Sequence, residues 1–267
     1  MSNNNKAVVV IKFGGNALNA ETGRAFCQTV AKLPAMGFAP VIIHGGGPQI
    51  NAMLDCVGVE SHFVNGLRYT DAETLRIAEM VLSGEVNKML VQFLGNAGAE
   101  AVGLSGKDGK LLIAEKLTQD DNGEPIDLGC VGQIQRVQPA LLQTLIAGGF
   151  VPVVAPIAYG VDGKTYNINA DYAAAAIAKA LSAKHFVMMT NISGLLDAEQ
   201  NVIHHANRAD IERLIAEGVI AGGMIPKTLS AVETLTTVGE VNLIDGRQAD
   251  NLLQVLSGQV LGTRIVA

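Results

Sequence analysis

Short runs of β-branched and other apolar residues alternate along this chain with longer segments whose apolar positions recur at helical spacing. The pattern predicts strands near 8–13, 40–44, 150–156, 185–190, 241–244 and 263–266, and helices near 21–36, 70–95, 172–181, 209–217 and 225–238. The second helix has a further signal, because Thr70 and Glu73 match a capping box. Alternating strands and helices predict a mainly parallel sheet with helices on its faces.

The middle of the chain interrupts this alternation. Residues 107–136 are rich in glycine and charge and carry an Asp-Asn-Gly turn signal at 121–123. They predict β-hairpins at an edge of the sheet. The alternation then resumes without a low-complexity linker, so we expect two lobes, 1–181 and 182–267, on one continuous sheet.

Charge and cysteine content narrow the classes of function. The chain has 267 residues, with 19 Lys and Arg against 25 Asp and Glu and no long run of one sign, which disfavours nucleic-acid binding. The three cysteines are widely spaced without a CxxC pair, so we expect buried free thiols. No apolar run approaches the roughly 20 residues that span a bilayer, and we expect a cytoplasmic protein without membrane contact.

Two glycine motifs follow the first two predicted strands. KFGG at 12–15 places Lys12 at a strand end before paired glycines, and HGGGP at 44–48 leads from a strand into a helix. Glycine lets backbone N–H groups approach an anion, and a helix N-terminus favours one. The first motif alone is equally consistent with a tight turn and an exposed lysine. Side by side at the carboxyl ends of parallel strands, the two motifs predict a ligand site.

Other motifs that contain these strings do not fit. An HGGG string occurs in esterase oxyanion holes, but no serine here matches the G-x-S-x-G elbow that such enzymes need. The GKT string at 163–165 lacks the P-loop glycine, because Ala158 stands in its place, and no GxGxxG motif is present. A nucleotide must therefore be held by a different fold.

Four further residues carry candidate chemistry. Arg68 could capture a carboxylate with its planar fork, although a lone arginine is more often a solvated surface residue. Asp171, at the start of a predicted helix, is either a cap residue or the anchor of lysines that touch phosphate. Asn167 could offer its amide to a substrate carboxylate. Lys227 lies in the first turn of a helix, where a cation opposes the dipole, and so indicates a bound phosphate.

The order of these motifs resembles that of the amino-acid kinase superfamily, and within it the acetylglutamate kinases. The motifs are Lys-x-Gly-Gly, Gly-Gly-Gly, Asn-Gly-Leu-Arg, Asn-x-Asn-Ala-Asp and Gly-Gly-Met-x-x-Lys, and the likeness runs from about Val8 to Arg264. It implies a three-layer αβα sandwich around a mainly parallel sheet, with an N-terminal acceptor lobe and a C-terminal nucleotide lobe. It also implies ATP-dependent phosphorylation of the side-chain carboxylate of N-acetylglutamate in arginine biosynthesis.

The resemblance implies a role for each motif residue. Lys12 and Lys227 are similar to the family lysines that contact the phosphates, and Asp171 to the aspartate that organises both. Arg68 and Asn167 resemble the pair that binds the substrate carboxylate that does not react. The glycines implied at the acceptor are Gly45 and Gly46, and the residues implied at the nucleotide are Gly14, Gly15, Asn191, Gly194 and Met224. The family usually has Asp at the position of Asn191.

The residue inventory agrees with this chemistry. A carboxylate is already ionised near neutral pH and needs no general base, so the histidines, including His44, are expected to be structural. Phosphoryl transfer depends mostly on positioning and charge neutralisation, which lysines and glycine N–H groups supply. Mg²⁺ is expected to arrive on ATP, not in a metal site made by the protein.

Two alternatives stay open, and the assembly is a further expectation. An aminoadipate-type acceptor of lysine biosynthesis is one methylene longer, a difference worth only about 1–3 kcal/mol in a pocket. A non-catalytic protein that senses ATP or an amino acid is the second alternative.

The resemblance implies a homodimer. Because few residues precede the first strand, we expect neither a hexameric ring built by an N-terminal helix nor strong inhibition by arginine.

Overall fold

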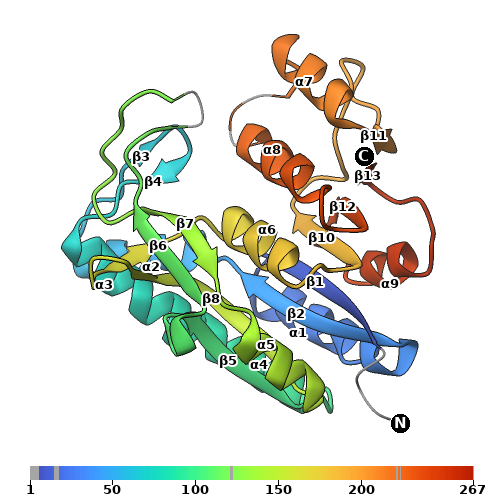
Figure 1. Cartoon of the computed structure of the whole chain (residues 1–267), viewed down its shortest axis with the longest axis horizontal. Coiled ribbons are helices and arrows are strands. Elements are labelled where there is room, and N and C mark those ends of the chain that lie inside the picture. The colour runs from blue at the N-terminus through green and yellow to red at the C-terminus, as the bar shows by residue number, and fades with distance from the viewer. Residues whose placement is uncertain (1–5, 15–17, 121–122, 221, 223, 267) are drawn as a thin grey trace.

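The computed structural model describes residues 6–14, 18–120, 123–220, 222 and 224–266 (Figure 1). Within them, an 11-stranded sheet runs in the order β11-β13-β12-β10-β1-β2-β8-β6-β7, with β5 and β9 also paired to β8. Its strands are β1 (Ala7–Phe13), β2 (Phe38–His44), β5 (Ala101–Gly106), β6 (Leu112–Lys116), β7 (Gly132–Val137), β8 (Val151–Gly160), β9 (Thr165–Asn167), β10 (His185–Thr190), β11 (His205–Ala206), β12 (Glu240–Asp245) and β13 (Thr263–Ile265). The central strands β12, β10, β1, β2 and β8 are parallel, as the sequence pattern predicts. A separate hairpin pairs β3 (Phe63–Val64) with β4 (Leu67–Arg68).

Helices cover both faces of the sheet (Figure 1). They are α1 (Ala20–Val30), α2 (Gly47–Val57), α3 (Ala72–Glu79), α4 (Asn87–Asn96), α5 (Ala140–Ala147), α6 (Ala170–Ala180), α7 (Arg208–Ala216), α8 (Met224–Thr234) and α9 (Asn251–Leu256), with short 3-10 turns η3 (Leu33–Met36) and η5 (Asp108–Lys110). Alternate residues of β1 pack into the two hydrophobic cores on opposite faces of the sheet. Val10 belongs to the core with residues of α6 and α8, and Val9 and Ile11 belong to the core with residues of α1 and α4. Because both faces are buried, the strand is apolar almost throughout. This is the predicted three-layer αβα sandwich.

The N-terminus of α3 differs from the prediction. The Asp71 carboxylate accepts the Thr74 N–H at 2.7 Å and caps the helix. Thr70 lies outside it, because its N–H donates to Leu128 O at 3.0 Å. The expected capping box at Thr70 and Glu73 is therefore wrong: long-range backbone pairing holds Thr70 away from the cap position. Beyond α3 the helical run continues to the predicted end through a π-helical segment, η4 (Met80–Val86), and α4.

Two predicted helices are shorter in the structure. α1 ends at Val30, and η3 follows with Pro34 in its first turn and Gly37, at φ 87°, as its left-handed cap. Proline lacks the N–H that would continue α1, and glycine readily adopts the left-handed turn that leads into β2. α8 likewise ends at Thr234 instead of near 238.

The segment 107–136 lies at the edge of the sheet, as predicted. β6 and β7 form an antiparallel pair, and β6 also pairs in parallel with β8. The predicted turn at 121–123 falls partly outside the described residues. An isolated bridge between Gln119 and Pro125 nevertheless brings the two sides of that turn together.

The cysteines match the expectation only in part. Cys27 is buried, and burial raises the pKa of its thiol to about 12. Cys130 is half-buried, whereas Cys56 is exposed on α2, so the expectation of buried thiols is wrong for Cys56. In the described part of the chain, no helix has the length and apolar character needed to cross a membrane.

Candidate active site

The two glycine turns lie side by side at the carboxyl ends of β1 and β2. Phe13 pairs with His44 in the parallel register, and Gly45 N–H extends the ladder by donating to Phe13 O at 2.9 Å. A Cβ on Gly14 would lie 2.7 Å from the Gly45 nitrogen, which would force the backbone apart. The close approach of the turns therefore requires glycine at position 14. Gly15 lies outside the described residues.

A cavity of about 310 Å³ opens at these turns and gathers half of the predicted site. Six predicted residues line it: Lys12, Gly45, Gly46, Arg68, Asn167 and Asp171. They come from β1, the turn after β2, β4, β9 and the first turn of α6. Apolar side chains complete the wall, among them Ile50, Phe63 and Leu82. The fold thus brings residues from four of the predicted motifs to one cavity.

Asp171 joins the two candidate phosphate lysines. Lys12 Nζ lies 3.0 Å from Asp171 Oδ1, and Lys227 Nζ donates to Oδ2 at 2.9 Å. Burial of Asp171 disfavours its charge, but the charges of Lys12 and Lys227 outweigh burial and hold the pKa of this carboxyl below its ordinary value. Two ammonium groups on one carboxylate leave an excess positive charge, so the cluster is suited to an anion.

The cap position of α6 belongs to another residue. Asn169 accepts the Asp171 N–H with its side chain at 2.7 Å and is the N-cap. The Asp171 carboxylate is therefore free of the capping role and faces the lysines. Of the two interpretations of Asp171, the geometry favours the lysine anchor.

Arg68 is buried with only 8% of its surface exposed. Its guanidinium donates to Ser61 Oγ and, at 3.2 Å, to Gly47 O, and lies 4.7 Å from the centroid of the Phe63 ring. Among the described residues, no carboxylate forms an ion pair with it. A buried guanidinium without an acidic partner is unfavourable. Its place in a cavity wall therefore favours an anionic ligand over a solvated surface role.

Asn167 lies in the same cavity wall at the end of β9. Its Nδ2 donates to Thr70 Oγ1 at 3.2 Å, and its N–H donates to Cys130 O at 2.9 Å. These contacts hold the side-chain amide near Arg68, where the resemblance places a carboxylate.

The predicted nucleotide residues are less closely gathered. Gly14, Asn191, Gly194 and Met224 line neither this cavity nor the larger one beside it. Gly194 has a packing reason of its own, since its φ is 154° and a Cβ there would lie 2.8 Å from Thr263 Oγ1. Met224 begins α8, the helix that carries Lys227 to Asp171.

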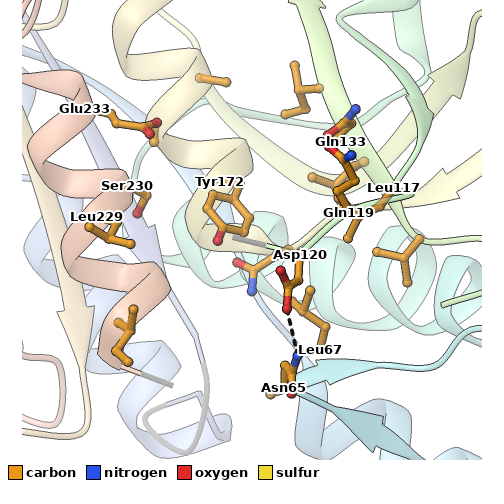
Figure 2. Close-up of a pocket in the computed structure, with 18 of the residues that line it drawn as sticks. Asn65, Leu67, Leu117, Gln119, Asp120, Gln133, Tyr172, Leu229, Ser230 and Glu233 are labelled. Atoms are coloured by element: carbon orange, nitrogen blue, oxygen red, sulfur yellow. Dashed lines mark hydrogen bonds between the residues drawn. The ribbon is translucent and has the colours of Figure 1, made fainter. Parts of the chain in front are cut away.

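The larger cavity, of about 920 Å³, adjoins the first and shares Leu67 with it. Figure 2 shows Glu233 of α8 on the left and Gln133 of β7 on the right, with Tyr172 of α6, Asp120 and Asn65 between them. Asn65 Nδ2 donates to Asp120 Oδ2 at 3.3 Å and so links the β3–β4 hairpin to the loop after β6. The cavity lies between elements of the two predicted lobes.

The sequence predicts a structural His44 beside the glycine turns, but it does not identify its partner Asn87. His44 is fully buried, with Nδ1 2.9 Å from Gly45 O and Nε2 3.1 Å from Asn87 Nδ2. Burial lowers the pKa of His44 to about 4. Asn87 belongs to no sequence motif. The one feature that could have identified it as a functional candidate is its position, a polar residue on the apolar face of a helix between Val86 and Leu90. Ser61 and Phe63, which hold Arg68, carry no comparable signal.

Comparisons with known proteins agree with this geometry. Residues 7–241 match the model of a family described as the amino acid kinase family. An acetylglutamate kinase from Methylobacillus flagellatus is 43% identical over 265 residues, which cover 97% of this chain and 90% of that protein. The structure of N-acetylglutamate synthase from Neisseria gonorrhoeae, complexed with coenzyme A and N-acetyl-glutamate, matches with a TM-score of 0.86 at 24% identity, over 99% of this chain and 60% of that one.

A second solved structure extends the likeness of fold. Carbamate kinase from Giardia lamblia bound to AMP-PNP has a TM-score of 0.70 at 18% identity and is covered over 98% of both chains. At such identities the two structures show the fold alone. The family model and the 43% identical relative confirm the resemblance predicted from the motifs. The chain belongs to the amino acid kinase family.

Proposed function

We propose that this chain is an acetylglutamate kinase. It transfers the γ-phosphoryl group of ATP to the side-chain carboxylate of N-acetyl-L-glutamate and forms N-acetyl-L-glutamyl 5-phosphate, a step of arginine biosynthesis. The observation that carries the proposal is a single cavity lined by two separate cationic features: Arg68, and Lys12, which shares the Asp171 carboxylate with Lys227. The 43% identity to a named acetylglutamate kinase supports the choice of acceptor.

The two cationic features suit the two carboxylates of the acceptor. Arg68 and Asn167 would hold the carboxylate that does not react, with the fork of Arg68 making paired hydrogen bonds. The other carboxylate would lie at the Gly46 turn, towards the phosphate lysines. One of its oxygens attacks the γ-phosphorus as the bond from that phosphorus to the ADP oxygen breaks. No proton has to move, because the nucleophile is already ionised.

Lys12 and Lys227 would neutralise charge on the phosphoryl group as it moves, while Asp171 keeps both ammonium groups in place. ATP use follows from membership of the kinase family. We place Mg²⁺ on the phosphates of ATP, with water as its other ligand. Within the described residues, no group of three or more His, Cys, Asp or Glu side chains could hold a metal ion, and the one acid beside the lysines is already paired with them.

The remaining features of the proposal concern the nucleotide and the assembly. The nucleotide would be held largely by the 182–267 lobe, with contributions from Gly14, Gly15, Asn191, Gly194 and Met224. The acceptor would be held by the 1–181 lobe.

We further propose a cytoplasmic homodimer. Light scattering should then give a mass near twice 27.9 kDa, and a hexamer would contradict it.

Acceptor-dependent ADP release tests the activity. We expect release with ATP, Mg²⁺ and N-acetylglutamate, weaker release with N-acetyl-α-aminoadipate, and almost none with Asp171→Asn. Faster turnover of the longer acceptor would assign the chain to the aminoadipate route. Binding of ATP without acceptor-dependent release would instead favour a sensor.

A further inference from the structure

A chain of polar contacts runs from the exposed residue Lys88 inward to the Gly45–Gly46 turn. Lys88 Nζ donates to Asn87 Oδ1 at 3.0 Å, Asn87 Nδ2 lies 3.1 Å from His44 Nε2, and His44 Nδ1 lies 2.9 Å from Gly45 O. Asn87 and His44 have no exposed surface. In such surroundings hydrogen bonds are strengthened, and an unmet donor or acceptor is costly. The chain is therefore well suited to fix the turn above it.

The partners of Asn87 decide which nitrogen of His44 carries the proton. Lys88 can only donate, so the atom it contacts must be the amide oxygen of Asn87. Two main-chain carbonyls, 3.2 and 2.9 Å from Nδ2, independently require the amide nitrogen there. The amide nitrogen thus faces three acceptors with two hydrogens, and His44 Nε2 is one of the three. Because this nitrogen cannot accept a hydrogen bond from the ring, Nε2 is unprotonated, and the ring proton lies on Nδ1 and is donated to Gly45 O. Burial lowers the pKa of His44 to about 4, so the ring is neutral near neutral pH.

The hydrogen bond from His44 sets the direction of a backbone donor. The carbonyl of Gly45 and the N–H of Gly46 belong to one peptide unit, and in a planar trans peptide they point in opposite directions. Because the carbonyl is held down towards buried His44, the Gly46 N–H is directed away from it, towards the cavity that Gly46 lines. Gly45 N–H is already engaged by Phe13 O, whereas Gly46 N–H has no acceptor within the described part of the chain.

The helical run that supplies Asn87 also holds the turn sterically. A Cβ on Gly46 would lie 2.7 Å from Leu82 Cδ2 and 3.3 Å from Val86 Cγ2. Both residues belong to the π-helical segment η4, which ends directly before Asn87. Single π turns within α-helices are frequent at functional sites. Here the π turn packs under the same peptide unit that His44 orients.

We propose that His44, held in its Nδ1–H form by Asn87, is a positioning residue that aims the Gly46 N–H at the phosphoryl group during transfer. His44 itself touches no substrate. Its contribution is preorganisation, because a donor that already points at the developing charge needs no rearrangement in the transition state. This inference rests on the proposed kinase activity, and it adds a function for a buried residue that lies outside the cavity wall.

A matched pair of variants tests the proposal. The amide nitrogen of asparagine can occupy the place of histidine Nδ1, whereas that of glutamine reaches the place of Nε2. We expect His44→Gln to lower kcat by about tenfold or more, with the KM values for ATP and acceptor changed by no more than about threefold, because a transition-state contact is lost. His44→Asn should recover most of that loss. Equal kcat in the two variants, whether both active or both inactive, would overturn the proposal.

Nitrogen NMR of the wild-type protein provides a readout that does not depend on folding of the variants. With ¹⁵N-labelled histidine, the His44 ring should show a protonated Nδ1 and an unprotonated Nε2 at neutral pH. A protonated Nε2 would overturn the proposal even if both variants unfold. Failure of the proposed activity would appear separately, as wild-type protein without acceptor-dependent ADP release.

Discussion

Lys227 Nζ donates a hydrogen bond to Asp171 Oδ2 at 2.9 Å and so joins the first turn of α8 to the first turn of α6. Helix N-termini carry partial positive charge, so a lysine in a first turn is unfavourable unless an anion lies close by. Asp171 supplies one such anion but is shared with Lys12, 3.0 Å from its other oxygen. The arrangement therefore favours a further anion at this place.

Asp171→Asn should lower kcat by about 100-fold or more, because the two ammonium groups lose the charge that orders them. α6 should remain capped by Asn169. As a control, Asn169→Ala removes the cap and should lower the free energy of unfolding by about 1 kcal/mol, measured by urea titration. If Asp171→Asn lost stability but its folded fraction kept full activity, the anchor role would be refuted.

Lys12→Ala and Lys227→Ala should each reduce kcat far more than they raise the KM for the acceptor, because their charges act on the moving phosphoryl group. Since both lysines pair with one carboxylate, the double variant should lose less than the sum of the two single losses in free energy. Steady-state kinetics of the three variants checks this. Near-normal turnover in either single variant would remove that lysine from the site.

Arg68→Lys should raise the KM for N-acetylglutamate by about tenfold or more and leave the KM for ATP nearly unchanged. An ammonium cannot reproduce the planar fork, nor the stacking on Phe63. Ser61→Ala, which removes only the hydroxyl that holds the guanidinium, should have a smaller effect in the same direction. A defect confined to ATP would place Arg68 outside the acceptor site.

Gly14→Ala should lower both the melting temperature and kcat, because its Cβ would meet the Gly45 backbone at 2.7 Å. Neither turn can yield without breaking the bond from Gly45 N–H to Phe13 O. Gly95→Ala is the matched control: outside the backbone of its own helix, no atom lies within 4 Å of a Cβ there, and alanine is the better helix former near the end of α4. Thermal unfolding of the two variants should therefore change in opposite directions.

Acidification should destabilise the protein through His44. The pKa of His44 is about 4 in the folded protein, compared with an ordinary value of 6.5. Between about pH 6.5 and pH 4, His44 is therefore protonated in the unfolded chain but stays neutral in the folded protein. The free energy of unfolding should fall by up to about 3 kcal/mol as pH drops from about 6.5 to about 4, and level off below. Urea titrations of wild type and His44→Asn across this range should show a smaller fall in the variant. An identical fall in the free energy of unfolding of both proteins would show that His44 is not the group responsible for the loss of stability.

Local patterns were enough to predict the architecture and the neighbourhood of the glycine turns. Apolar runs bounded by glycine and proline predicted the central strands, and parallel pairing then required the ends of β1 and β2 to meet. The order of the motifs predicted the family, which the comparisons confirm. The roles of the individual site residues stay predictions.

The contacts that give those residues their chemistry come from long-range packing. The sequence is consistent with Asp171 as either a helix cap or a lysine anchor. In the structure Asn169 holds the cap position, and Lys227, from another helix, donates to the Asp171 carboxylate. By sequence alone, Arg68 could be a solvated surface arginine. In the structure it is buried, and no acidic side chain among the described residues pairs with it. No sequence motif identifies Asn87, which contacts His44. Periodicity reports which face of an element is apolar. It does not report which polar side chains share a low-dielectric space, and that depends on segments far apart in the chain.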